Sequence, residues 1–180
     1  MARRRRRRRP DCRQWLKTLG VTVIGTVGSE EKAKLARDHG ADHVINYSKE
    51  NFVERSSTIT GGKKLPVVYD AVGKATWDGS LDCLRPRGLM VSFGNASGPV
   101  PPVNLGILST KGSLYVTRPT LATHIASRAD LLERAASLFG VVKSGKVKIE
   151  TTGRYKLAEA QQAHRDLESR KTTGSIILLP

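Results

Sequence analysis

The chain has 180 residues, of which 38% are hydrophobic, and this length and composition are typical of one soluble domain with its own core. Its formal net charge is +15, but seven consecutive arginines occupy positions 3–9, which leaves +8 for the remainder. No apolar run approaches the roughly 18 residues of a membrane span, and no signal-peptide core follows the basic start. Cys12 and Cys83 form no CxxC or Cys/His cluster, so we expect two buried thiols in the reducing cytoplasm rather than a zinc site or a disulfide framework.

The arginine run suggests a nucleic-acid arm, a nuclear address or a targeting segment, because clustered guanidinium groups bind phosphate. A transit peptide would be Ser-rich and amphipathic, and a nucleic-acid surface would interleave aromatic residues or glycine, and this run has neither pattern. An accidental or upstream-translated start is therefore favoured over an evolved arm. In either case we expect residues 1–11 to be disordered by self-repulsion.

Strands and helices are predicted to alternate along the rest of the chain. The period of the apolar residues predicts a helix over residues 11–19 that resembles the tail of a longer one, and Gly20 ends it. Strands are then expected over residues 21–27, 43–47, 65–72, 88–93, 113–117 and 175–179. Helices are expected over residues 29–40, 50–60, 77–84, 104–108, from 127 onward and from 156 to 169.

This alternation predicts an α/β fold, a Rossmann-like doubly wound parallel sheet, because only crossover helices join parallel strands. Residues 12–145 would form a partial dinucleotide-binding domain and residues 146–180 a C-terminal return segment. Ligands of such sheets bind beyond the carboxyl ends of the strands. Where NAD-type folds place an acidic residue for the ribose 2′-hydroxyl, this chain has Gly28 and Ser29, with Lys32 one turn later. A 2′-phosphate would therefore be accepted.

Six ordered sequence runs resemble one known family. They are Ile24 to Gly28, Gly40 to Tyr47, Val67 to Gly73, Gly88 to Asn95, Tyr115 to Pro119, and Ala163 to Arg170. The chain resembles the NADPH-dependent quinone oxidoreductases, the zeta-crystallin-like branch of the medium-chain dehydrogenase/reductase superfamily. The resemblance implies a full-length enzyme of about twice this length, with an N-terminal barrel-like domain and hydride transfer from NADPH to a quinone without zinc. It also implies a homodimer formed through the strand from Leu114 to Thr117.

The resemblance further implies cofactor contacts at the strand ends. Gly28 and Lys32 would contact the adenosine ribose and its 2′-phosphate, and Tyr47 would lie beside the adenosine end. Val72 would line the cofactor's path, and Phe93, Gly94 and Asn95 would lie near the nicotinamide. Pro119, Thr120 and Leu121 would contact its carboxamide, and Arg170 would be a charge partner of the cofactor. Each has a purely structural alternative: the two aromatic rings would finish the core, Gly94 would only start a loop, and Arg170 would neutralise a helix end.

No catalytic residue and no metal ligand is predicted. The four histidines, His39, His43, His124 and His164, lack the Ser, Cys or Asp partner of a nucleophile–base pair. His164 shares an apolar helix face, so we expect it to pack. Asp70 is the most enzyme-like carboxylate, yet no second acid accompanies it.

The sequence also departs from the family. Rossmann folds hold pyrophosphate on a glycine-rich turn after the first strand, and neither GxGxxG nor AxxGxxG occurs in these 180 residues. The sheet is therefore predicted to lack its first, central strand and that turn. Three interpretations follow. The chain is a quinone oxidoreductase that has lost its N-terminal half and is inactive alone, a short non-catalytic dimerisation module, or a nucleic-acid-binding protein that uses the arginine run.

Overall fold

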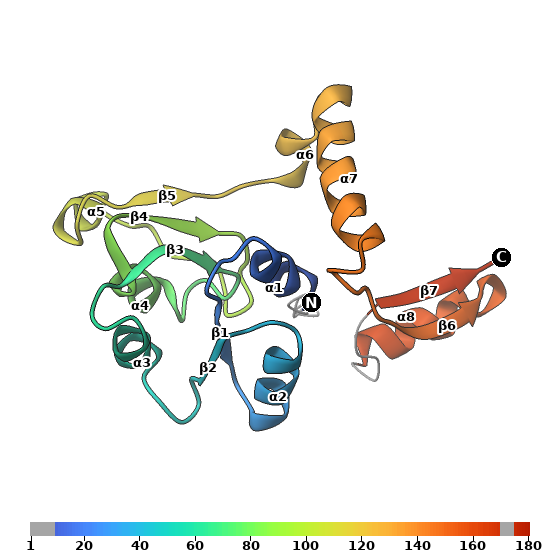
Figure 1. The fold of residues 1–180 in the computed structure, drawn as a ribbon, viewed down its shortest axis with the longest axis horizontal. Helices are drawn as coiled ribbons and strands as arrows, with labels where there is room; N and C mark the ends of the chain where they lie inside the picture. Colours follow the sequence, from blue (N-terminus) through green and yellow to red (C-terminus); the bar gives the residue numbers. More distant parts are fainter. Residues whose placement is uncertain (1–9, 170–174) are drawn as a thin grey trace.

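The structure is a computed structural model that describes residues 10–169 and 175–180 (Figure 1). Its strands are β1 (Ile24–Val27), β2 (His43–Asn46), β3 (Leu65–Asp70), β4 (Leu84–Ser92), β5 (Tyr115–Thr117), β6 (Thr151–Lys156) and β7 (Ser175–Leu179). Its helices are α1 (Pro10–Thr18), α2 (Glu30–Asp38), α3 (Phe52–Ile59), α4 (Trp77–Asp82), α5 (Gly106–Thr110), α6 (Leu121–His124), α7 (Arg128–Lys143) and α8 (Ala160–Glu168), with a 3₁₀ turn at Leu157–Glu159 before α8. The arginine run and Arg170 lie outside the described residues.

The strands form three separate parallel sheets. Strand β1 pairs with β2, β3 pairs with β4 and β4 with β5, and β6 pairs with β7. The orders β2–β1 and β3–β4–β5 match the two sides of the doubly wound order 3-2-1-4-5-6 with its central strand left out. Within the described residues, neither β1 nor β3 has a strand partner on the edge that would face that position. The predicted α/β fold with an incomplete sheet is thus confirmed.

The helix starts follow local rules. Ser29 caps α2 by accepting a hydrogen bond from the Lys32 amide at 3.4 Å, and Asn51 caps α3 by accepting one from the Val53 amide at 2.9 Å. Glu30 and Glu31 occupy the first turn of α2, where the helix dipole favours negative charge.

Each of the first two sheets packs on its own small core. Ala33 and Ala36 of α2 pack against Val27 and Ala41 beneath β1 and β2. Leu81 and Leu84 pack with Met90 and Leu114 beneath β3, β4 and β5. Each core thus belongs to one of the two sheets that flank the unfilled strand position.

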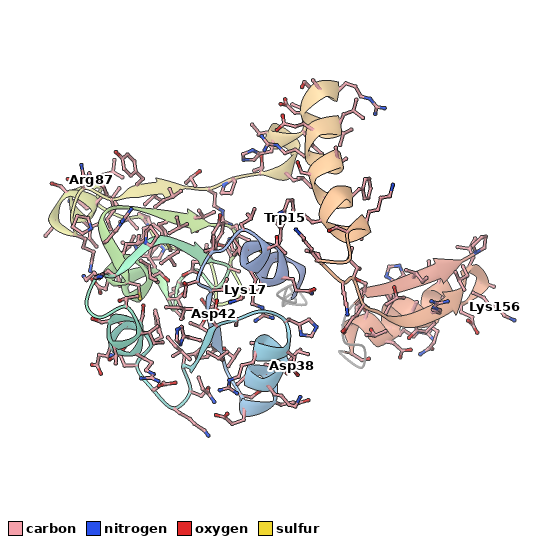
Figure 2. The ribbon with its side chains drawn as sticks, viewed as in Figure 1. Trp15, Lys17, Asp38, Asp42, Arg87 and Lys156 are labelled. Carbon is pink, nitrogen blue, oxygen red and sulfur yellow. The ribbon has the colours of Figure 1, made fainter. Side chains whose placement is uncertain are left out.

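Helix α1 connects the first sheet to the C-terminal part of the chain. Its Lys17 forms an ion pair with Asp42, whose other oxygen accepts the Val23 amide at 2.9 Å (Figure 2). The Gln14 side chain makes two hydrogen bonds with the backbone of Lys148. Its oxygen accepts from the Lys148 N–H at 2.8 Å, and its nitrogen donates to the Lys148 carbonyl at 3.2 Å. These contacts hold the start of the return segment on the dinucleotide-binding part of the chain.

The C-terminal strand-helix-strand unit stands apart from the first two sheets, and α7 extends away from them (Figure 1). Strand β7 pairs locally with β6. None of the α7 residues is buried, although Leu131, Leu138 and Phe139 were expected to face a core. The period of the apolar residues predicted the helix correctly, but the surface that would cover the apolar face of α7 is not among the described residues.

Two other burial predictions were wrong. Cys12 is exposed, whereas Cys83 is buried as expected. His164 is also exposed, although its neighbour Ala163 is buried. Of the helices in the described part of the chain, none has the length and apolar character that crossing a bilayer requires.

Candidate functional site

The candidate site consists of the loops that follow β1 to β5. The strands within each sheet are parallel, so their carboxyl ends lie at one edge. The loops after β1 and β2 form one half of the site. The loops after β3, β4 and β5 form the other.

Gly28 and Tyr47 form the centre of the first half. A Cβ atom added to Gly28 would lie 2.7 Å from the Tyr47 hydroxyl oxygen, so only glycine lets the loop after β1 approach the ring. Ser48 donates a hydrogen bond to the Gly28 carbonyl at 3.1 Å and joins the two loops. The Tyr47 residue is 53% exposed, so its ring completes no core and offers a face to a ligand.

Polar groups at the start of α2 surround this glycine. The Glu30 carboxylate accepts from the Asn46 amide at 2.9 Å and pairs with Lys49 at 3.1 Å. These contacts hold the pKa of Glu30 below its ordinary value. The carboxylate of Glu30, two residues after Gly28, therefore already has partners within the protein, on β2 and in the loop that follows it. Lys32 lies on the exposed first turn of α2.

Asp70 ends β3 and fixes the turn that follows it. One carboxylate oxygen accepts the amides of Val72 at 2.6 Å and Gly73 at 3.0 Å. The other accepts the hydroxyls of Thr76 at 2.6 Å and Ser80 at 2.7 Å. Burial alone raises the pKa of Asp70, but these four donors outweigh it and leave the pKa below the usual value. The predicted enzyme-like carboxylate is therefore an ionised anchor.

The loops after β3 and β4 meet backbone to backbone. A Cβ atom on Gly94 would lie 2.4 Å from the Ala71 carbonyl oxygen, and one on Gly73 would lie 2.6 Å from the Gly98 carbonyl oxygen. Gly73 also has a φ of +88°, which disfavours other residues. The Ser97 amide donates to the Val72 carbonyl at 2.8 Å. The predicted residues Val72 and Gly94 are thus brought together.

Arg118 joins the end of β5 to this pair of loops. Its guanidinium donates to the Ser92 hydroxyl at 3.0 Å and to the Gly94 carbonyl at 3.3 Å. The same region holds a cavity of about 390 Å³ lined by Trp77, Ser92, Asn95, Pro99, Val100, Val116 and Arg118. Arg118 was not among the predicted residues, although its position directly after a strand was a signal that could have identified it.

The remaining predicted residues divide between these loops. Phe93 is 40% exposed and makes an edge-to-face contact with Tyr69, their ring centroids 6.4 Å apart. Thr120 occupies the N-cap position of α6 without a side-chain capping hydrogen bond, with Pro119 just before it and Leu121 as the first helical residue. Leu121 is largely exposed. Arg170 lies outside the described residues.

The geometry offers binding surfaces rather than acid–base groups. The ends of a doubly wound parallel sheet, with glycines at the points of closest approach, are characteristic of the nucleotide-binding domain of dehydrogenases and reductases.

Comparison with known proteins agrees. The chain belongs to the zinc-binding dehydrogenase family, whose model matches residues 12–139. It is 60% identical over 167 residues to a quinone oxidoreductase of Pseudomonas aeruginosa, covering 93% of this chain and 51% of that protein. A 2-haloacrylate reductase of Burkholderia is 46% identical, with 92% of this chain and 50% of that protein covered. The crystal structure of Escherichia coli quinone oxidoreductase complexed with NADPH has 54% identity and a TM-score of 0.85, covering 95% of this chain and 53% of that one.

The chain spans about half the length of the curated relatives it matches, and it corresponds to their C-terminal half. The family's description names zinc, which requires several thiolate, imidazole or carboxylate ligands together. Across residues 10–169 and 175–180, no three His, Cys, Asp or Glu side chains gather in this way. The residues described do not fit a zinc ion, and we derive no step through one.

Proposed function

We propose that this chain is the cofactor-binding half of an NADPH-dependent quinone oxidoreductase. The observation that carries the proposal is the 60% identity to the Pseudomonas aeruginosa quinone oxidoreductase, which extends over 93% of the chain. When bound, NADPH supplies the hydride that reduces the quinone. The residues of this chain bind and orient the cofactor.

The adenosine half would lie over Gly28, Lys32 and Tyr47. Gly28 brings the loop after β1 against the Tyr47 ring because it carries no side chain, and the half-exposed ring offers a flat apolar face. Lys32 and the positive end of the α2 dipole supply positive charge for a 2′-phosphate. Glu30, the nearby acid, is held by Asn46 and Lys49, so it does not compete for the ribose hydroxyls.

The nicotinamide half would lie over the loops after β3, β4 and β5. We assign to it the residues Val72, Phe93, Gly94, Asn95, Pro119, Thr120 and Leu121, with Arg170 as a charge partner of the cofactor. Support comes from the tight pairing of the first two loops, which holds Val72 and Gly94 at a fixed separation. A fixed surface orients a planar ring better than a mobile one because less entropy is lost on binding.

The pyrophosphate has no glycine-rich turn in these 180 residues, and β1 and β3 leave a strand position unfilled among the described residues. We therefore expect the purified chain to oxidise NADPH with 1,4-benzoquinone no faster than buffer does. Co-expression with the N-terminal half of the Pseudomonas aeruginosa relative should restore a complex that turns over. Fast turnover by the chain alone, or no turnover by a stable complex, would contradict the proposal.

Lysine variants test the cofactor preference in that complex. Lys32→Ala should raise the KM for NADPH about tenfold and leave the KM for NADH unchanged, since only NADPH carries the 2′-phosphate. Lys34→Ala is the matched control, because Lys34 lies on the same helix and pairs with Asp38. Equal effects of both variants on both cofactors would exclude a specific role for Lys32.

We further propose a homodimer, located in the cytoplasm, that forms through the segment from Leu114 to Thr117. Within the described residues, β5 pairs with β4 on one edge only, and Tyr115 is 61% exposed. A free strand edge is a template for pairing with another copy. Light scattering after size exclusion should give twice the chain mass, and proline at Tyr115 or Val116 should reduce it, because one of the two adjacent N–H groups points outward.

A further inference from the structure

The loops after β3 and β4 are supported by a carboxylate that is not among the proposed cofactor contacts. Asp70 is 5% exposed, and its two oxygens accept four hydrogen bonds, two from backbone amides and two from hydroxyls. The amide donors belong to Val72 and Gly73 in the turn, and the hydroxyl donors belong to Thr76 and Ser80 at the start of α4. One side chain therefore fixes the turn to both the strand before it and the helix after it.

The effect of Asp70 extends into the next loop through the turn that it fixes. The Val72 carbonyl accepts both the amide and the hydroxyl of Ser97 at 2.8 Å. The Lys74 amide donates to the Gly98 carbonyl at 3.1 Å, and Gly73 packs against the same carbonyl. Any movement of the turn at Val72 must therefore shift the segment from Gly94 to Gly98.

Only a carboxylate satisfies this arrangement. Four donors point at Asp70, and an ionised carboxylate is acceptor-only with room for all of them. Asparagine has nearly the same shape, but its amide nitrogen donates and cannot accept. Hydrogen bonds to an ionised group are also shorter and stronger than neutral ones.

We propose that Asp70 is a positioning residue: it sets the turn at Val72 and Gly73, and through Ser97 it sets the loop at Gly94, in the arrangement that receives the nicotinamide half of the cofactor. This inference rests on the proposed function. Asp70 contacts no ligand itself. It acts through the backbone of the two loops.

We call the carboxylate of Asp70 with its four hydrogen-bond donors the clamp. Hydrogen exchange of the chain tests the clamp directly. In Asp70→Asn, the amides of Val72, Gly73, Lys74 and Ser97 should exchange about tenfold faster or more, relative to intrinsic rates. The Tyr47 amide, which donates to the Val27 carbonyl in the other sheet, should change less than twofold. Asp38→Asn is the control, because Asp38 is an exposed carboxylate paired with Lys34. A uniform increase over both sheets, or no change at Ser97, would overturn the proposal.

Two variants at Thr76 refine the result. Thr76→Val removes one donor to Asp70 while keeping the side-chain shape, and Thr76→Ser keeps the donor. Faster exchange at Val72 and Ser97 in the valine variant, with rescue by serine, is expected. Equal exchange in the two variants would show that packing and not the carboxylate holds the turn.

Nucleotide binding by the co-expressed complex connects the clamp to the site. Asp70→Asn should weaken NADPH binding about tenfold, but it should leave 2′,5′-ADP binding unchanged, because that nucleotide reaches only the first half of the site, at Gly28, Lys32 and Tyr47. Equal loss of both nucleotides would indicate general damage and would overturn the positioning role. If neither nucleotide binds the unaltered complex, the proposed function fails, and the exchange experiment still decides whether the clamp exists.

Discussion

The two halves of the candidate site are built by different means. Around Gly28, the loops after β1 and β2 meet through side-chain tips: the Tyr47 ring, the Ser48 hydroxyl and the Glu30 carboxylate. Around Gly94, the loops after β3 and β4 meet through backbone atoms anchored by the buried Asp70. The end of a side chain can move when a neighbouring residue is replaced by a larger one, whereas backbone atoms cannot. The first half should therefore tolerate substitution, and the second should not.

The largest effect is expected at Gly94. In Gly94→Ala the new methyl would overlap the Ala71 backbone at three atoms within 3 Å, which forces the two loops apart. We expect a loss of about 3 kcal/mol in the free energy of unfolding, measured by urea denaturation. A loss below about 1 kcal/mol would show that the second half is as adaptable as the first.

The next effect is the response of the second half to acid. The folded pKa of Asp70 lies below its unfolded value of about 3.9, so its stabilisation is complete above that pH and is lost as pH falls through the folded value. Asp70→Asn should cost about 2 kcal/mol at pH 7 and should flatten the decline in stability between about pH 5 and pH 2. Stability measured against pH would contradict this role if both proteins kept the same acid slope.

A smaller effect is expected at Gly28. In Gly28→Ala the methyl meets only the far end of the Tyr47 side chain, which can rotate away. We expect a cost of about 1 kcal/mol or less. Urea denaturation beside Gly94→Ala gives the comparison, and Gly28→Ala combined with Tyr47→Leu should recover most of the loss. An equal cost at Gly28 and Gly94 would remove the distinction between the two halves.

The smallest effects are expected away from both halves. Gly140→Ala should stabilise the chain by about 0.8 kcal/mol, because Gly140 lies inside α7 with no atom within 4 Å of an added Cβ. Lys34→Ala should cost about 0.3 kcal/mol, since its partner Asp38 is exposed and lies one turn along the same helix. Thermal unfolding of both variants provides the baseline. A larger change in either would show that sites outside the two halves also carry substantial stability.

Sequence patterns predicted most elements, within a few residues at each end. The start of β4 was predicted at residue 88, yet the strand begins at Leu84. Between Leu84 and residue 88 the strand is irregular, since Arg87 takes a φ of +58° and the pairing with β3 shifts between Leu65 and Val67. Helix α6 was not predicted, since its four residues are too few to show a period. The exposure of Cys12 and of the apolar side of α7 was also missed. Periodicity shows which face is apolar and not whether another element covers it.

The site was predicted as separate residues and not as contacts. Gly28 and Tyr47 were each expected at the cofactor, but nothing in the sequence shows that a methyl on one would strike the hydroxyl of the other. Asp70 was noted as a carboxylate after a strand, and its four donors are spread over residues 72–80. Arg118 was overlooked because its two partners come from β4 and the loop after it.

By itself, the sequence determined the order of strands and helices, the parallel sheets and the absence of a glycine-rich phosphate turn, because each depends on residue types at short, regular spacing. The family resemblance came from the order of six short runs in the same way. Only the tertiary structure decided that Asp70 is an ionised anchor and that two loops meet through their backbones. Those features depend on atoms brought together from distant parts of the chain, and local spacing carries no record of such distances.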